Sequence, residues 1–388
     1  MRITNLKVYQ IHGAGMHPVL VELNTDDGIS GFGEAAVAYG LGAKATAGML
    51  TDIAPLIIGS DARYPRNVWH RVYDNSFWTK GGGAIVFSAL SAIDQALWDI
   101  KGKAMGVSVS ELLGANFTGT VSVYANGWNH NHDDALEWAK AAERPLKDGY
   151  TKLKSYPFAT KQEGGTLVHV QRRALLDAEF KRACERTRNL RKVVGDGVEL
   201  MFDLSGGLSS DQLIRFLELC QEVNIVWIEE PLDAFNMSGY KALAGRWNMP
   251  IATGERVYTR HAFKTLLDTN GVDVIMPDVG NCGGIWELVQ IAGMAEAYNV
   301  RVSPHNCASA LCTKASIQAW AACSNAMALE IYPYFSDAND YVHVLKNPAE
   351  EEISKGELRL TDEPGLGAEV NMENIAPFKS FEYQQAVL

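Results

Sequence analysis

The segment IVWIEEPLDAFNMSGYKALAGRWNMPIATGE, residues 225–255, contains the pattern that decides the fold. An apolar run ends in Glu229, and a second apolar run, residues 251–253, ends just before Glu255. The two acids are 26 residues apart (255 − 229). One strand–helix unit of a parallel barrel has about this length, because roughly 250 residues are divided among eight units. The segment therefore predicts one unit of such a barrel.

The same alternation extends on both sides of this segment. Strands are predicted at residues 121–125, 151–155, 199–204, 225–229, 251–253, 272–276, 300–303 and 326–331. Amphipathic helices, such as residues 211–222 and 286–298, lie between most of them. Eight strands alternating with helices favour a parallel (β/α) barrel over an open sheet. We expect the barrel to occupy residues 119–355.

The remaining parts of the chain predict a second unit. Residues 1–118 combine a strand meander with helices, the clearest over residues 84–103, and are interpreted as an α+β capping domain. Residues 356–388 are rich in loops, and we expect this tail to return to the cap. Residues 156–168 exceed what one barrel unit needs, which predicts an extended loop over the barrel mouth.

Composition limits the functional classes. A net charge of −11 argues against a nucleic-acid partner, which needs a basic surface, but it allows an anionic small molecule. Neither a signal-peptide core nor a membrane-spanning run is recognisable in the sequence, so a membrane association is not expected. The six cysteines are scattered without a CxxC pair, which indicates reduced thiols. We expect a cytoplasmic protein that forms a homo-oligomer.

Three acids recur at one position of successive barrel units. Glu229 follows Asp203 by 26 residues (229 − 203), the same interval that separates Glu229 from Glu255. All three follow predicted strands, so they are expected at the C-terminal mouth of the barrel. Taken singly, each acid is more typical of a surface residue. Together, three converging carboxylates need a hard divalent cation, and oxygen ligands favour Mg2+.

Candidate acids and bases follow other strands. Lys152 and Lys154 alternate on one strand, so both are expected to face the same cavity and to lower each other's pKa. Asp278 and His305 follow adjacent strands, 27 residues apart (305 − 278), where the carboxylate would orient the imidazole. Glu330 ends the last strand and, if protonated, could donate a hydrogen bond to a substrate carboxylate.

Together these residues describe one chemistry. The proton on the carbon next to a carboxylate is very weakly acidic, and its removal requires a base and strong stabilisation of the enediolate that forms. A magnesium ion and an acid would supply that stabilisation. Bases on two sides would allow the proton to return on the other face, or a β-hydroxyl to be protonated and expelled.

At this point the sequence resembles the enolase superfamily, specifically its mandelate racemase subgroup. The resemblance covers nearly the whole chain and is carried by SAIDQALWDIKGK (residues 91–103), WIEEPL (227–232) and DVGNCGG (278–284). It implies a (β/α)7β TIM-like barrel with an α+β cap whose loops near residues 14–18 and 75–83 select the substrate. It further implies the following site residues: Asp203, Glu229 and Glu255 as magnesium ligands, Lys154 as a base tuned by Lys152, the His305–Asp278 dyad as the other base, and Glu330 as the electrophilic acid.

Within the subgroup, ATGERVYTR (252–260) and IAGMAEAY (291–298) look like sugar-acid dehydratases of the galactonate type. That type carries a histidine two residues after the first metal ligand, whereas this chain has Ser205 there together with the lysine pair. The base arrangement resembles that of mandelate racemase and of several aldarate and fuconate dehydratases. The resemblance thus implies a hydro-lyase that acts on an acid sugar, a small carboxylate, and produces a 2-keto-3-deoxy acid.

Several alternatives stay open. A racemase, epimerase or lactone cycloisomerase could use the same residues, and the scaffold could also serve a non-catalytic metal-binding protein. A barrel glycosidase would need two carboxylates, which fits the acid triad and lysine pair poorly. The sequence does not name the acid sugar. Residues expected near the mouth that could bind it are Trp78, Lys80, Trp128, Asn129, His130, Asn131 and His132.

Overall fold

Eight parallel strands form a barrel in the computed structural model, which describes residues 1–12, 16–115, 119–129, 132–161, 167–169, 175–334 and 342–384. The strands are β4 (Thr120–Ala125), β5 (Lys152–Ser155), β8 (Glu199–Asp203), β9 (Trp227–Glu229), β10 (Ile251–Thr253), β11 (Val274–Ile275), β12 (Arg301–Val302) and β13 (Leu329–Ile331). Their spatial order is β12-β11-β10-β9-β8-β5-β4-β13. A parallel bridge between Val302 and Ala326 joins the two ends of this order and closes the ring.

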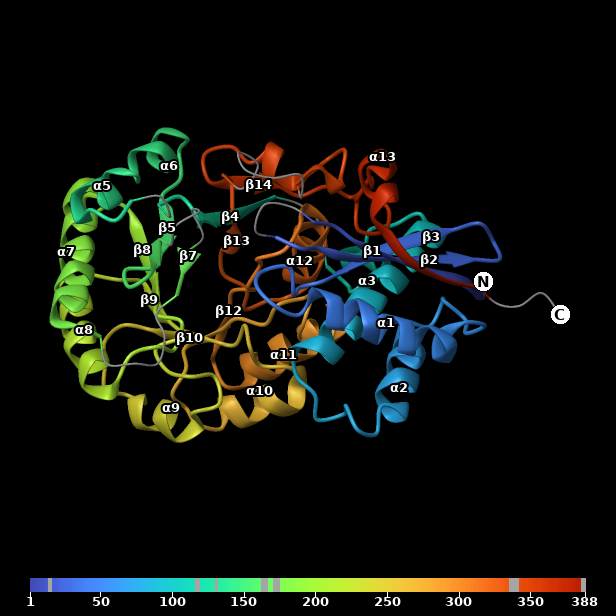
Figure 1. Cartoon of the computed structure of the whole chain (residues 1–388), viewed down its shortest axis with the longest axis horizontal. Coiled ribbons are helices and arrows are strands. Elements are labelled where there is room, and N and C mark those ends of the chain that lie inside the picture. The colour runs from blue at the N-terminus through green and yellow to red at the C-terminus, as the bar shows by residue number, and fades with distance from the viewer. Residues whose placement is uncertain are drawn as a thin grey trace.

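Helices follow each of the first seven barrel strands and cover the outside of the ring (Figure 1). They are α5 (Ala135–Lys140), α6 (Glu143–Lys147), α7 (Asp177–Val194), α8 (Ser210–Glu222), α9 (Met237–Leu243), α10 (Thr259–Leu267), α11 (Ile285–Ala297) and α12 (Ala310–Ala321). In α8, the residues Leu213, Phe216, Leu217 and Cys220 recur at helical spacing and are buried against the barrel. The interior of the ring is filled by side chains that include Tyr124, Met201 and Trp227. The expected (β/α)7β barrel is confirmed.

The cap is a four-stranded antiparallel sheet with helices packed on it. Its strands are β1 (Ile3–Gln10), β2 (Val19–Thr25), β3 (Ser30–Ala35) and β15 (Lys379–Gln384), and its helices are α1 (Ala43–Ile57), α2 (Pro65–Asn75), α3 (Ala84–Met105) and α4 (Val109–Leu112). Helix α3 lies directly against β3, because a Cβ atom on Gly33 would come within 2.0 Å of the Ala92 carbonyl oxygen. Figure 1 shows this unit beside the barrel, with the N-terminus and β15 on the cap side.

The C-terminal tail contacts both units. Strand β14 (Glu357–Arg359) pairs antiparallel with β4 of the barrel, and β15 pairs antiparallel with β1 of the cap. Short helical turns lie at Val342–Val344, Ala349–Glu352 and Ala376–Phe378, together with α13 (Met372–Ile375). The tail therefore returns to the cap sheet, while the domain limits at residues 118 and 355 stay predictions.

One local expectation differs from the structure. We expected an extended loop at residues 156–168, but a two-stranded hairpin begins there with β6 (Thr160–Lys161) and ends with β7 (Leu167–Val168). All six cysteines are free thiols, and three of them are buried. None of the helices in the described ranges has the length and apolar character that a bilayer crossing requires.

Candidate active site

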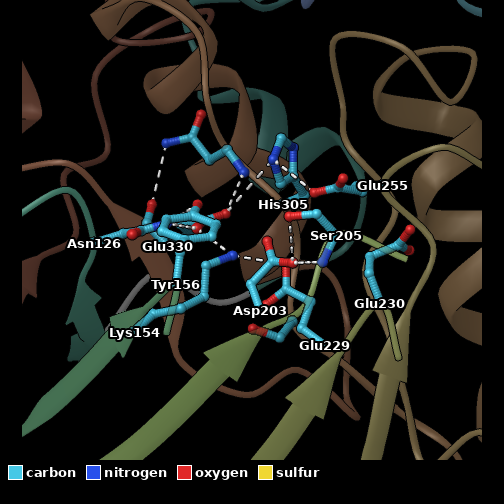
Figure 2. A network of polar contacts seen from close by, with 12 residues as sticks. Asn126, Lys154, Tyr156, Asp203, Ser205, Glu229, Glu230, Glu255, His305 and Glu330 are labelled. Carbon is cyan, nitrogen blue, oxygen red and sulfur yellow. Dashed lines mark hydrogen bonds and ion pairs between the residues drawn. The ribbon is translucent and has the colours of Figure 1, made fainter. Parts of the chain in front are cut away.

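Three carboxylates converge at the mouth of the barrel. Asp203 and Glu229 are the last residues of β8 and β9, and Glu255 follows the end of β10. One carboxylate oxygen from each lies within 4.8 Å of the others, as the close-up in Figure 2 illustrates. Burial raises the pKa of Glu229 well above its ordinary value and that of Glu255 to about 7. Three oxygen donors in one acidic, largely buried cluster fit a hard divalent cation.

The backbone next to two of these acids is strained. Ser205 has φ of 51° and Glu230 has φ of 45°, a left-handed conformation that residues other than glycine rarely adopt. Such strain concentrates at functional sites, where surrounding contacts hold it in place. Glu230 accepts hydrogen bonds from Thr253 Oγ1 at 2.5 Å and from Arg256 Nε at 3.0 Å, so it fixes the segment that carries Glu255. Sequence reasoning missed this role, although WIEEPL places a second acid directly after Glu229.

His305 lies between two carboxylates on the β11–β12 side of the mouth. Its Nδ1 atom is 2.6 Å from Asp278 Oδ2, and its Nε2 atom is 3.2 Å from Glu255 Oε2. Backbone pairing between Asp278 and His305 sets their relative positions. Burial lowers the pKa of His305, but the carboxylates of Glu255 and Asp278 outweigh this and raise the pKa to about 10. The predicted pair is therefore brought together beside the acid triad.

Lys154 is fully buried and forms ion pairs with two carboxylates. Its Nζ atom lies 2.6 Å from Glu229 Oε1 and 2.7 Å from Glu330 Oε1 (Figure 2). Burial lowers the pKa of Lys154, yet the two carboxylates outweigh burial and raise the pKa well above its ordinary value. Lys154 is thus an ammonium group that links Glu229 of the triad to Glu330 of the last strand.

The prediction that Lys152 shares this cavity and lowers the pKa of Lys154 is wrong. Lys152 Nζ lies 2.7 Å from Glu199 Oε1. Lys152 and Glu199 are the first residues of β5 and β8, at the end of the barrel opposite the mouth. The alternation of side chains identifies the face of a strand but not the depth along it. The two lysines consequently bind different carboxylates.

Glu330 differs from the expected protonated donor. Its carboxylate accepts hydrogen bonds from Asn126 Nδ2 at 2.7 Å and from the Asn306 backbone N–H at 3.0 Å, in addition to the ion pair with Lys154. Burial raises the pKa of Glu330, but Lys154 and His305 outweigh it and lower the pKa below its ordinary value. In this arrangement Glu330 is an ionised acceptor.

A group of neutral donors next to Glu330 was missed by sequence reasoning. Asn126 Nδ2 also lies 2.8 Å from the hydroxyl of Tyr156 and 2.8 Å from that of Tyr332. These two hydroxyls are themselves 3.0 Å apart. All three residues follow barrel strands, which is the only signal that the sequence offers for them.

The predicted mouth residues have different environments. Trp128 is buried and its indole Nε1–H donates to the Lys154 carbonyl at 2.8 Å, so it is held against β5. Trp78 is 92% exposed, and Lys80 pairs with Asp74 at 3.3 Å on the cap surface. His130 and Asn131, and residues 14–15 of the first expected loop, lie outside the described residues.

Comparison with known families agrees with this site. A model described as "Mandelate racemase / muconate lactonizing enzyme, N-terminal domain" matches residues 11–114, and one described as "Enolase C-terminal domain-like" matches residues 137–374. The chain belongs to the enolase superfamily, in its mandelate racemase subgroup. As a member of this superfamily it is an enzyme, and its named relatives place it among the hydro-lyases.

Relatives match over nearly their full length. D-galactonate dehydratase of Ralstonia nicotianae is 30% identical over 96% of this chain and 92% of its own, and that of Variovorax paradoxus is 31% identical over 97% and 94%. A crystal structure from Mesorhizobium loti has a TM-score of 0.94 at 44% identity and covers 99% of this chain and 100% of its own. The 3,6-anhydro-D-galactonate cycloisomerase of Zobellia galactanivorans has a TM-score of 0.83 at 25% identity, covering 98% and 100%.

Proposed function

We propose that this enzyme is a magnesium-dependent acid-sugar dehydratase. It would remove the proton on the carbon next to the substrate's carboxylate and expel a β-hydroxyl as water. The observation that carries the proposal is one arrangement: three carboxylate oxygens within 4.8 Å of one another, with the His305–Asp278 pair, 2.6 Å apart, beside them. The relatives named D-galactonate dehydratase support the same chemistry.

Asp203, Glu229 and Glu255 would hold the magnesium ion. When bound, magnesium stabilises the negative charge that develops on the substrate carboxylate as the proton leaves. Lys154 holds the carboxylates of Glu229 and Glu330 in place through its two ion pairs. The amide of Asn126 and the hydroxyls around it supply neutral hydrogen-bonding groups next to Glu330, suited to a substrate rich in hydroxyl groups.

His305 would act as the acid for the departing hydroxyl. Asp278 holds Nδ1, so Nε2 is the nitrogen that carries the mobile proton toward the mouth. As the carbon–oxygen bond breaks, the oxygen takes this proton and leaves as water. The α-proton must then be accepted on another side of the mouth. The ion pairs of Lys154 make its ammonium an electrostatic partner of two acids rather than a free base.

The test is a screen of mono- and diacid sugars, D-galactonate among them, for 2-keto acid formation. The wild type with magnesium is compared with a chelated sample and with Asp203→Asn. We expect at least one acid sugar to yield a 2-keto acid, only in the magnesium sample of the wild type. Absence of product from the whole panel, or equal product after chelation, would overturn the proposal.

A lactone cycloisomerase is the second candidate, because a solved relative is named as a cycloisomerase. The same site could isomerise a substrate after removing its α-proton. The two activities differ in mass balance, since a dehydratase product lacks one water and an isomerase product retains every atom. Mass spectrometry of the product from the screen therefore decides between them.

A further inference from the structure

A second histidine, His169, contacts the mouth of the barrel, although it does not directly follow a barrel strand. His169 Nδ1 lies 2.8 Å from the Ser205 hydroxyl oxygen, although the two residues are 36 positions apart. Ser205 is in turn hydrogen-bonded to Asp203: its backbone N–H donates to Asp203 Oδ1 at 2.7 Å, and its hydroxyl donates to the same oxygen at 3.4 Å. His169 is thereby connected to the edge of the acid triad through one side chain.

Three separate segments hold this imidazole. The ring of Tyr156, just after β5, meets it edge-on at 5.0 Å between centroids, and the ring of Tyr39, from the cap, does so at 5.9 Å. Ser205, after β8, contacts its Nδ1 atom. A surface histidine would not be fixed from the barrel and the cap together. The position of His169 is therefore built into the fold.

His169 and His305 lie on opposite sides of the barrel. Ser205 follows β8 and His305 follows β12, and the sheet order places β9, β10 and β11 between these two strands. In a ring of eight strands, a separation of four is the greatest there is. A substrate held at the triad would thus have one imidazole on each side.

The hydrogen bonds determine which nitrogen of His169 can react. We assign the ring proton of His169 to Nδ1, because the Ser205 hydroxyl donates to Asp203 Oδ1 at 3.4 Å and its oxygen is then the acceptor for Nδ1–H. This tautomer leaves the lone pair on Nε2. Burial lowers the pKa of His169, the cations of Lys154 and Arg256 act in the same direction, and Asp203 opposes them. The neutral ring that results is the form a base requires.

We propose that His169 is the base that takes the α-proton from the acid-sugar substrate, with Ser205 as the residue that positions it. The inference rests on the proposed dehydratase function. Nε2 accepts the proton, the electrons of the broken C–H bond form the new C=C bond, and the β-oxygen leaves with the proton of His305 as water. The enol that results becomes the 2-keto acid by taking a proton at the neighbouring carbon.

The test compares His169→Asn with wild type in the magnesium-loaded full chain, on an acid sugar that the wild type dehydrates. The amide of asparagine can replace Nδ1 in the hydrogen bond to Ser205, but it cannot accept the proton. We expect kcat to fall at least about 100-fold with little change in melting temperature. His261→Ala, which removes an exposed histidine of α10, is the matched control and should keep wild-type kcat.

His169→Ala provides a second readout that a structural role would not move. Added imidazole should restore part of its activity, because free imidazole can occupy the space and accept the proton. The acidic limb of the wild-type pH profile, set by His169 among Asp203, Lys154, Arg256, Tyr39 and Tyr156, should disappear in His169→Asn.

The outcomes separate the two proposals. Wild-type activity on an acid sugar together with near-normal kcat in His169→Asn would overturn the role of His169 and leave the dehydratase function standing. If the wild type dehydrates no acid sugar, the proposed dehydratase function is overturned, and the role of His169 as its base is overturned too.

Discussion

Lys154 Nζ lies 2.6 Å from Glu229 Oε1, so a buried ammonium pairs directly with a member of the acid triad. The same nitrogen lies 2.7 Å from Glu330 Oε1. One cation therefore neutralises part of the charge that the acid triad and Glu330 bring to the mouth. This explains why so many buried acids can coexist there before a metal ion is considered.

Removal of this cation should destabilise the fold. Lys154→Met leaves two buried carboxylates without their partner, and we expect the free energy of unfolding to fall by roughly 3–5 kcal/mol. Lys152→Met is the matched control on the same strand, because its ion pair with Glu199 is partly exposed and should contribute at most about 1 kcal/mol. Urea denaturation of both variants measures the difference. Equal losses would contradict the account of Lys154.

The acid triad should control metal binding. Asp203→Asn, Glu229→Gln and Glu255→Gln each remove one formal charge from the site, and we expect each to weaken Mg2+ binding at least tenfold, roughly 1.4 kcal/mol. Isothermal titration calorimetry with magnesium measures this directly. Glu199→Gln, at the opposite end of β8, should bind magnesium like the wild type. Unchanged affinity in all three triad variants would refute the metal site.

Asp278 should affect catalytic activity because its carboxylate orients the imidazole of His305. Asp278→Asn replaces the acceptor of the Nδ1 proton, so the imidazole would lose the orientation that its 2.6 Å contact provides. We expect kcat/KM on the dehydrated acid sugar to fall about 100-fold or more. Asp273→Asn is a suitable comparison, because the Asp273 carboxylate accepts the Ile251 backbone N–H at 2.9 Å and has no role in the proposed reaction. The activity of this variant should be close to that of the wild type. A similar loss in both variants would argue against a dyad.

A buried acid outside the proposed catalytic set should make stability depend on pH. Burial raises the pKa of Asp94, which lies against the N-terminus of α11, to about 7, whereas an unfolded aspartate titrates near 3.9. Because the folded pKa is the higher one, its contribution is present below about pH 3.9 and is lost as the pH rises through 7. We expect wild type to lose up to about 4 kcal/mol from this group over that window.

Asp94→Asn isolates that contribution. The variant carries no charge at this position, so its melting temperature should fall less than that of wild type between pH 5 and pH 8. Other buried acids such as Glu34, whose pKa burial raises to about 7, leave a residual slope in both proteins. Identical slopes for the two proteins would contradict the raised pKa of Asp94.

Spacing along the chain was sufficient to predict the barrel and the acid triad. Each strand–helix unit repeats at a nearly constant length, so Asp203, Glu229 and Glu255 recur where strands end, and the same rule placed Asp278, His305 and Glu330. Lys152 was misplaced because alternation says nothing about depth in the barrel. Its position as the first residue of β5 depends on where the strand begins, which the sequence fixes only loosely.

Contacts between distant segments could not be predicted from the sequence. His169 follows β7, in a stretch without hydrophobic periodicity, and only the folded chain brings it to Ser205. The opposite charge state of Glu330 has a similar origin, because Lys154, Asn126 and Asn306 reach it from three other elements. Residue types and strand positions predicted the convergence of the three acids, whereas the charge states of the surrounding groups depended on tertiary contacts.

The most direct test is the product that the wild type forms from an acid sugar in D2O with magnesium, analysed by NMR and mass spectrometry. Removal of the α-proton and loss of the β-hydroxyl predict a 2-keto-3-deoxy acid that lacks one water and carries one deuterium at C3, with no product after chelation. A product that has lost no water and carries deuterium at C2 would contradict the dehydratase account. Formation of the dehydrated product in the chelated sample would contradict it as well.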